Sequence, residues 1–151
     1  MKRQLALSWL TSTLLITAGC TAAMDTQPPA TMPNESLINT YWKLVTLGDQ
    51  PVVTRENVRE AHLVLHQDAS RLAGATGCNT LMGSYHLENK HITFSQIATT
   101  MMACPTQQME TEHVLLVALR QVAEWEVNGN KLILFGDNDK QLASFEAVHL
   151  F

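Results

Sequence analysis

Short apolar runs separated by polar turns make up most of the chain after residue 40, and they constrain its fold more than any other feature. In the first run, Trp42 and Leu44 alternate with more polar residues, which is typical of a strand with one buried face. Strands are predicted at Tyr41–Leu47, His62–His66, Arg71–Ala75, Leu81–Leu87, His91–Phe94, Trp125–Val127, Lys131–Phe135 and Gln141–Ala147. Because hairpin-length turns such as Asn128-Gly129-Asn130 connect them, we expect a mainly β (α+β) domain with a small antiparallel curved sheet or half-open barrel.

One helix is predicted in the segment after Pro105, with Thr106 as the residue that caps its start. On a helical projection the apolar side chains fall within one arc, so the helix is expected to pack on the sheet. Glu112 projects close to this arc. A side chain that reaches solvent at the helix end, or caps backbone donors, is the more common reason for such a position than a buried catalytic acid. The arc consists of Leu115, Leu116, Ala118, Leu119, Val122 and Ala123.

The first 20 residues have the pattern of a bacterial export signal. Lys2 and Arg3 form a basic start, residues 5–16 are mostly apolar, and Thr17-Ala18-Gly19 places small residues before Cys20. As a helix, the apolar segment spans about 18 Å, too short for a hydrocarbon core of about 30 Å. The ending resembles the lipobox of bacterial lipoproteins, in which the chain is cut before a lipidated cysteine. We therefore predict Cys20 as a lipidation site that anchors the protein to a membrane.

Thr17 departs from the lipobox, because the motif usually has leucine three residues before the cysteine. Cleavage by the ordinary signal peptidase, or a buried N-terminal helix, are the alternatives. After Cys20, residues 21–35 contain three prolines and no aromatic or branched aliphatic residue, which predicts a flexible tether. Thr21 in place of Asp after the cysteine indicates the outer membrane, by resemblance to lipoproteins of Gram-negative bacteria. The predicted organisation is a signal peptide at 1–19, a tether at 20–36 and one domain at 37–151.

The charge of the mature chain argues against nucleic acid as a partner. Removal of residues 1–19 takes away two basic residues and no acidic one, so the formal net charge changes from −4 to −6. The remaining basic residues are scattered singly, without the basic patch that nucleic-acid binding needs. The same charge disfavours direct binding of the domain to anionic lipid headgroups.

Cys78 and Cys104 are the two cysteines of the predicted domain. If the chain is exported they meet an oxidising compartment, where a disulfide is the expected state. A bond that closes a loop of about 26 residues stabilises a fold by roughly 3.5 kcal/mol in the chain-entropy account. The alternative is a redox-active pair, which would be supported by a CxxC spacing and an adjacent base, and the sequence has neither. We therefore favour a structural disulfide.

Motifs for catalysis or metal binding were not found. The sequence contains no GxSxG and no HExxH. Two pairs of histidines come nearest to a metal site, His62 with His66 and His86 with His91, but the first pair is about 13 Å apart on one strand and neither has a clear third ligand. Met101-Met102 suits soft-metal binding or, more commonly, gap filling in a core. The sequence therefore predicts no enzyme activity, no metal and no cofactor.

Several short motifs occur in a fixed order along the predicted domain. They are Trp42-Lys43-Leu44, Gly74-Ala75-Thr76-Gly77-Cys78-Asn79, Gly83-Ser84-Tyr85, the segment 97–105, Met109-Glu110-Thr111-Glu112, and the hairpin 127–134. In this order the chain resembles the META domain of the HslJ heat-shock-protein family, over roughly residues 37–148. The resemblance implies a compact antiparallel domain with one packed helix, in which Cys78 and Cys104 pair. Met101 is a departure, because many members have arginine there.

The resemblance implies a class of protein rather than a reaction. Members of the family occur as bacterial envelope proteins and lipoproteins, and some are linked to heat shock, antibiotic tolerance or motility. We therefore predict a non-enzymatic outer-membrane lipoprotein that faces the periplasm and acts in stress tolerance or envelope assembly through an envelope protein partner. One version is assembly of secretins, because the family resembles pilotins in shape. The alternative is a carrier of a lipid or other small apolar ligand, lined by Trp42, Leu44, Leu115 and Leu119, although core packing explains the same residues.

Overall fold

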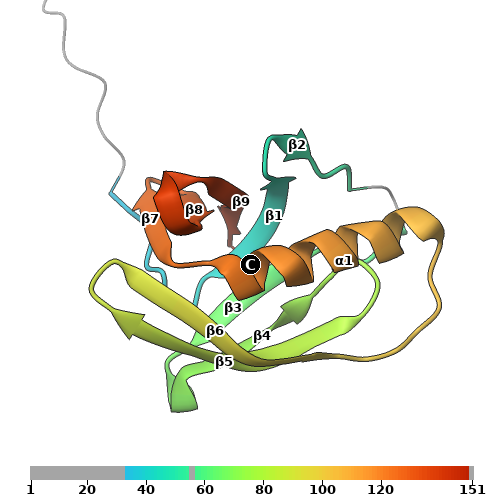
Figure 1. The fold of residues 1–151 in the computed structure, drawn as a ribbon, viewed down its shortest axis with the longest axis horizontal. Helices are drawn as coiled ribbons and strands as arrows, with labels where there is room; N and C mark the ends of the chain where they lie inside the picture. Colours follow the sequence, from blue (N-terminus) through green and yellow to red (C-terminus); the bar gives the residue numbers. More distant parts are fainter. Residues whose placement is uncertain (1–32, 55–56, 150–151) are drawn as a thin grey trace, which may run out of the picture. The chain divides into compact units, whose positions relative to one another are not determined.

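The computed structural model describes residues 33–54 and 57–149, and this part of the chain forms one antiparallel sheet with one α-helix (Figure 1). The predicted signal peptide, Cys20 and most of the predicted tether lie outside the described residues. The strands are β1 (Tyr41–Leu47), β2 (Gln50–Pro51), β3 (His62–His66), β4 (Arg71–Ala75), β5 (Thr80–Glu88), β6 (His91–Thr99), β7 (Glu124–Asn128), β8 (Lys131–Phe135) and β9 (Gln141–Val148). The helix is α1 (Thr106–Gln121), and two short 3₁₀ turns lie at Asp68–Ser70 and Asp137–Asp139.

The sheet curves round so that β1 pairs with β9, but it is nearly open between β6 and β7. From β3 to β9 each strand pairs with the next, and β1 pairs with both β3 and β9. Between β6 and β7, however, the register contains only the pair His91 and Glu124. The chain leaves β6, forms α1 and returns as β7, and α1 packs against β6, β9 and β1 (Figure 1). The predicted curved antiparallel sheet with one packed helix is confirmed, and the sheet is not a complete barrel.

The core fills the space between the curved sheet and α1. Alternate side chains of β1 and β3 point into it, as the period of two predicts. Trp42 is fully buried, and its indole N–H donates to the carbonyl oxygen of Leu37 at 3.0 Å, so its polar group is satisfied. The largest fully buried side chains are Trp42, Phe145, Leu44, Leu63, Leu65, Leu72, Leu81, Ile92, Leu115, Leu119, Leu132 and Leu134.

Three local features differ from the sequence-based expectation. β2 was not predicted, because a strand of two residues has no periodicity to detect. β6 continues to Thr99, beyond the predicted end at Phe94, because a β-bulge with Gln96 at φ 53° interrupts the alternation. Thr106 does not cap α1: Pro105 occupies the cap position, and its carbonyl accepts the first helical hydrogen bonds.

Residues 31–151 form a compact unit of their own. All described strands, α1 and the hydrophobic core belong to this unit. In residues 33–54 and 57–149, no helix is both long and apolar enough to cross a membrane.

Candidate functional site

A disulfide between Cys78 and Cys104 joins two segments next to the start of α1. Cys78 lies in the loop between β4 and β5, and Cys104 lies in the segment between β6 and α1. Gly77, directly before Cys78, has φ 93°, a conformation that glycine adopts easily and other residues rarely do. The predicted disulfide is therefore confirmed, and it ties the sheet to the start of the helix.

A buried carboxylate lies beside the disulfide. Glu112 of α1 is only 9% exposed, and the amide Nδ2 of Asn79 donates to both of its oxygens, at 3.1 and 2.9 Å. The hydroxyl of Thr76 donates to the same carboxylate. The sequence favoured a Glu112 side chain that reaches solvent or caps a helix end, and the structure shows neither. The β4–β5 loop instead supplies side-chain donors that hydrogen-bond the carboxylate inside the protein.

Asn79 extends this network from α1 to the end of β6. Its Oδ1 accepts hydrogen bonds from the hydroxyl of Thr100 at 2.9 Å and from the backbone N–H of Met102 at 2.8 Å. The backbone N–H of Asn79 donates to the hydroxyl oxygen of Thr76 at 2.9 Å. One fully buried side chain thus holds together the β4–β5 loop, the end of β6 and α1. We call Thr76, Asn79 and Glu112 the buried polar network.

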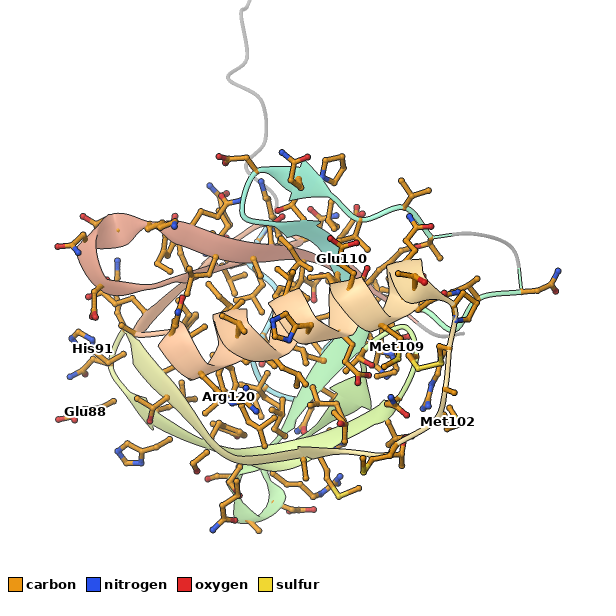
Figure 2. All side chains as sticks on the ribbon, turned by 45° about the vertical axis from the view of Figure 1, so that its right-hand side comes forward. Glu88, His91, Met102, Met109, Glu110 and Arg120 are labelled. Atoms are coloured by element: carbon orange, nitrogen blue, oxygen red, sulfur yellow. A yellow bond between two sulfur atoms is a disulfide. The ribbon has the colours of Figure 1, made fainter. Side chains whose placement is uncertain are left out.

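Three methionines around the disulfide are exposed. Met101 is 98% exposed, Met102 51% and Met109 41%. The Sδ atom of Met109 lies 3.8 Å from Sγ of Cys78, and Figure 2 shows Met102 and Met109 beside the disulfide bond. Gap filling in the core, which the sequence favoured for Met101-Met102, is therefore wrong. We call Met101, Met102 and Met109 the methionine surface.

A hollow of about 300 Å³ lies between α1 and the segment that follows β2. Its lining includes Gln108 and Val114 from α1, Val52 and Val58 from the opposite segment, and Gly77. Figure 2 shows Glu110, another lining residue, on the side of α1 that faces β1 and β2. The lining contains none of the four residues predicted for an apolar ligand, because Trp42, Leu44, Leu115 and Leu119 are buried in the core.

The sequence profile of the META domain matches residues 35–149 of this chain. The chain belongs to the META domain family. The predicted resemblance is thus confirmed, and the disulfide, the buried polar network and the methionine surface all come from segments within the matched region.

Solved structures share the fold of this META domain. A protein from Burkholderia xenovorans, solved by NMR, is 25% identical, with a TM-score of 0.64 over 76% of this chain and 85% of that chain. A second NMR structure is 22% identical, with a TM-score of 0.57 over 72% and 88% of the two chains. The crystal structure of a DUF4847 family protein from Bacteroides vulgatus ATCC 8482 is 13% identical, with a TM-score of 0.54 over 73% and 93%. No curated protein matches the sequence at a significant level.

The four histidines considered as metal ligands lie on three strands: His62 and His66 on β3, His86 on β5 and His91 on β6. In the described ranges 33–54 and 57–149, no three His, Cys, Asp or Glu side chains are grouped so that they could hold a metal ion. The Nδ1 atom of His91 lies 3.6 Å from a carboxylate oxygen of Glu124, at the single pair that joins β6 to β7. His62 stacks on Tyr41, with ring centroids 4.2 Å apart.

Tyr41 belongs to a small cluster on the outer face of β1 and β3. Its hydroxyl donates to Oε1 of Glu60 at 3.3 Å, and Nζ of Lys43 lies 2.6 Å from the other oxygen of the same carboxylate. Burial, followed by the negative charge of Glu60, raises the pKa of Tyr41 to about 12. The phenol therefore stays neutral at every physiological pH.

We expect alkaline pH to destabilise the domain through Tyr41. Because the folded pKa lies above the ordinary value of 10.0, the contribution of Tyr41 to stability is complete below pH 10 and is lost as the pH rises toward 12. Absorbance titration of a Tyr85→Phe variant, which leaves Tyr41 as the other tyrosine of the chain, should give a midpoint near 12 in the folded state. Glu60→Gln should lower this midpoint. An unshifted midpoint in the folded protein would contradict the burial of Tyr41.

Proposed function

We propose that this META domain protein is a non-enzymatic cell-envelope lipoprotein that acts through a protein partner, in stress tolerance or assembly of the envelope. Lipidation of Cys20 would anchor it to the outer membrane, facing the periplasm, with residues 21–32 as part of the tether. Several acyl chains on one cysteine give stable anchoring. The disulfide between Cys78 and Cys104 supports an oxidising compartment, where such bonds persist.

The methionine surface is the observation that supports a protein partner. Unbranched thioether side chains adapt their shape to a partner, and exposed apolar side chains that lie together mark interaction sites more often than scattered ones do. The surrounding sequence adds to this, because residues 92–109 contain no charged side chain. A partner that binds there therefore removes no charged side chain of this segment from water, which would cost free energy. A small-ligand role is favoured by a different feature, the hollow between α1 and the segment after β2.

Photo-crosslinking in the producing cell tests the partner and the anchor together. A photoreactive amino acid at Met101 or at Met109 should give one discrete adduct with an envelope protein, found in the membrane fraction. The same amino acid at Glu88, an exposed residue at the end of β5, serves as the matched control and should give none. Combining the Met101 probe with Cys20→Ala should move the protein to the soluble fraction.

Two outcomes would overturn the proposal. If the probes at Met101 and Met109 give no adduct, or give the same adducts as the probe at Glu88, the methionine surface does not bind a specific partner. If the Cys20→Ala protein stays in the membrane fraction after a wash at high salt, the lipid anchor is wrong.

A further inference from the structure

The side chains of the methionine surface are nucleophiles as well as adaptable apolar groups, because each contains a thioether sulfur. We propose that Met101, Met102 and Met109 are a modification site for small two-electron oxidants, hypohalous acids and peroxides, and that their sulfoxides no longer bind the partner. The loss of binding rests on the proposed function, whereas the modification does not. Conversion to the sulfoxide turns a flexible apolar side chain into a polar one and disrupts methionine-rich interfaces.

Exposure determines which methionines an oxidant in solution reaches first. Met101 is 98% exposed, so an oxidant can approach its side chain from almost every direction. Met102 is 51% exposed. In residues 33–54 and 57–149 the methionine outside the methionine surface is Met82 of β5, and it is 51% exposed as well. Met82 and Met102 are therefore a pair of equal exposure, one outside the surface and one within it.

The disulfide leaves methionine as the sulfur that reacts at this corner. Cys78 and Cys104 are bonded to each other, so no free thiol in the described residues competes for the oxidant. Met102 and Met109 lie beside this bond (Figure 2), and Sδ of Met109 is 3.8 Å from Sγ of Cys78. Oxidation of Met109 therefore places a polar sulfoxide against the disulfide.

The chemical step adds one oxygen atom to sulfur and needs no cofactor. With hypochlorous acid, the sulfur lone pair attacks chlorine, the chlorine–oxygen bond breaks and hydroxide leaves. Water then displaces chloride from sulfur and releases two protons, one of which neutralises the hydroxide. Sulfur loses two electrons and chlorine gains two, so the products are the sulfoxide, chloride and one proton. With hydrogen peroxide, sulfur attacks one oxygen, the oxygen–oxygen bond breaks and water leaves.

The sulfoxide changes what the surface can bind. Its oxygen is a hydrogen-bond acceptor, which an apolar partner surface covers without supplying a donor. A buried acceptor without a donor weakens binding about tenfold. The fold itself depends little on these side chains, because none of the three belongs to the hydrophobic core or to the buried polar network. Oxidation should therefore remove partner binding and leave the domain folded.

Peptide mapping by mass spectrometry tests the modification site in the protein purified with its disulfide formed. A limiting amount of hypochlorous acid should produce the sulfoxide of Met101 before that of Met82 or Met102. A larger amount should also modify Met102 and Met109, and the circular dichroism spectrum should stay that of the untreated protein. Oxidation of Met82 ahead of Met101, or unfolding at the dose that modifies all three methionines, would overturn the proposal.

Photo-crosslinking in isolated envelopes tests the effect on the partner. A photoreactive amino acid at Ala103, an exposed residue next to Met102, should give the partner adduct before oxidation. Hypochlorous acid should abolish the adduct, and a methionine sulfoxide reductase should then restore it. An adduct that persists after complete oxidation would show that the sulfoxides do not control binding. Absence of the adduct before oxidation would overturn the proposed partner, and with it the control of binding, while the peptide map still decides the modification site.

Leucine and glutamine variants separate oxidation of this chain from oxidation of its partner. Replacing Met101, Met102 and Met109 together by leucine keeps the surface apolar, so the adduct should survive the oxidant. Met82→Leu is the matched control and should still lose the adduct. Replacing the same three residues by glutamine makes the surface polar and should abolish the adduct without any oxidant. Loss of the adduct from the oxidised leucine variant, or an undiminished adduct from the glutamine variant, would overturn the proposal.

Discussion

Replacement of both bridged cysteines, in Cys78→Ser/Cys104→Ser, is expected to lower the free energy of unfolding by about 3.5 kcal/mol, which corresponds to a fall in Tm of roughly 10–20 °C. The bond closes a loop with a sequence separation of 26, so its removal frees the unfolded chain to adopt many more conformations. The loss is large for a small domain, because total stabilities are only about 5–15 kcal/mol. Denaturant unfolding of residues 31–151, with and without the substitutions, measures it.

A reductant supplies the control for this prediction. Reduction of the unaltered protein should produce the same loss as the double substitution, and the reductant should have no effect on the Cys78→Ser/Cys104→Ser protein. A change of less than about 1 kcal/mol would mean that the loop is held by other contacts, with the buried polar network as the first candidate.

Asn79→Ala is expected to cost about 3–5 kcal/mol, although it removes only a short polar side chain. The substitution removes the two hydrogen bonds that the Asn79 amide donates to the Glu112 carboxylate, and it takes the acceptor away from Thr100 and from the backbone N–H of Met102. These hydrogen bonds are buried or partly buried, so water cannot fully replace the lost partners. Thermal and denaturant unfolding of residues 31–151 give the magnitude.

Variants of two glutamates on α1 make the Asn79 prediction specific. Glu110→Gln changes an exposed carboxylate on the same helix and should alter stability by no more than about 0.5 kcal/mol. Combining Asn79→Ala with Glu112→Leu removes the carboxylate along with the Asn79 amide that donates to it, so the double variant should lose less than the two single changes added together. Simple additivity of the two changes would mean that Asn79 and Glu112 do not support each other.

The strands could be predicted because their signal is local. Alternation in β1 and β3 and the hairpin turn Asn128-Gly129-Asn130 depend on neighbouring residues, so the predicted ends agree closely with the structure. The helix after Pro105 was found for the same reason. The pairing of Cys78 with Cys104 needed no geometry, because the predicted domain contains no other cysteine.

The features of the candidate site were not predictable, because they depend on residues far apart in sequence. Glu112 and Asn79 are separated by 33 positions, and a glutamate near the apolar arc of a helix more often reaches solvent. The exposure of Met101 depends on where β6 ends. The bulge at Gln96 breaks the alternation of apolar and polar residues, so the sequence pattern does not show this end. The hollow requires α1 and the segment after β2 to be placed in space, which no local pattern provides.

The domain cannot finish folding until β1 has paired with β9. The register joins Tyr41 to Val148 and Trp42 to Ala147, so the first long strand needs a partner from the far end of the chain. Pairing across such a separation is slow to form, since most of the chain must be ordered first. On the proposed export route, the sheet would stay incomplete until β9 has emerged, and loss of the C-terminal residues of β9 would leave an edge of β1 without its partner.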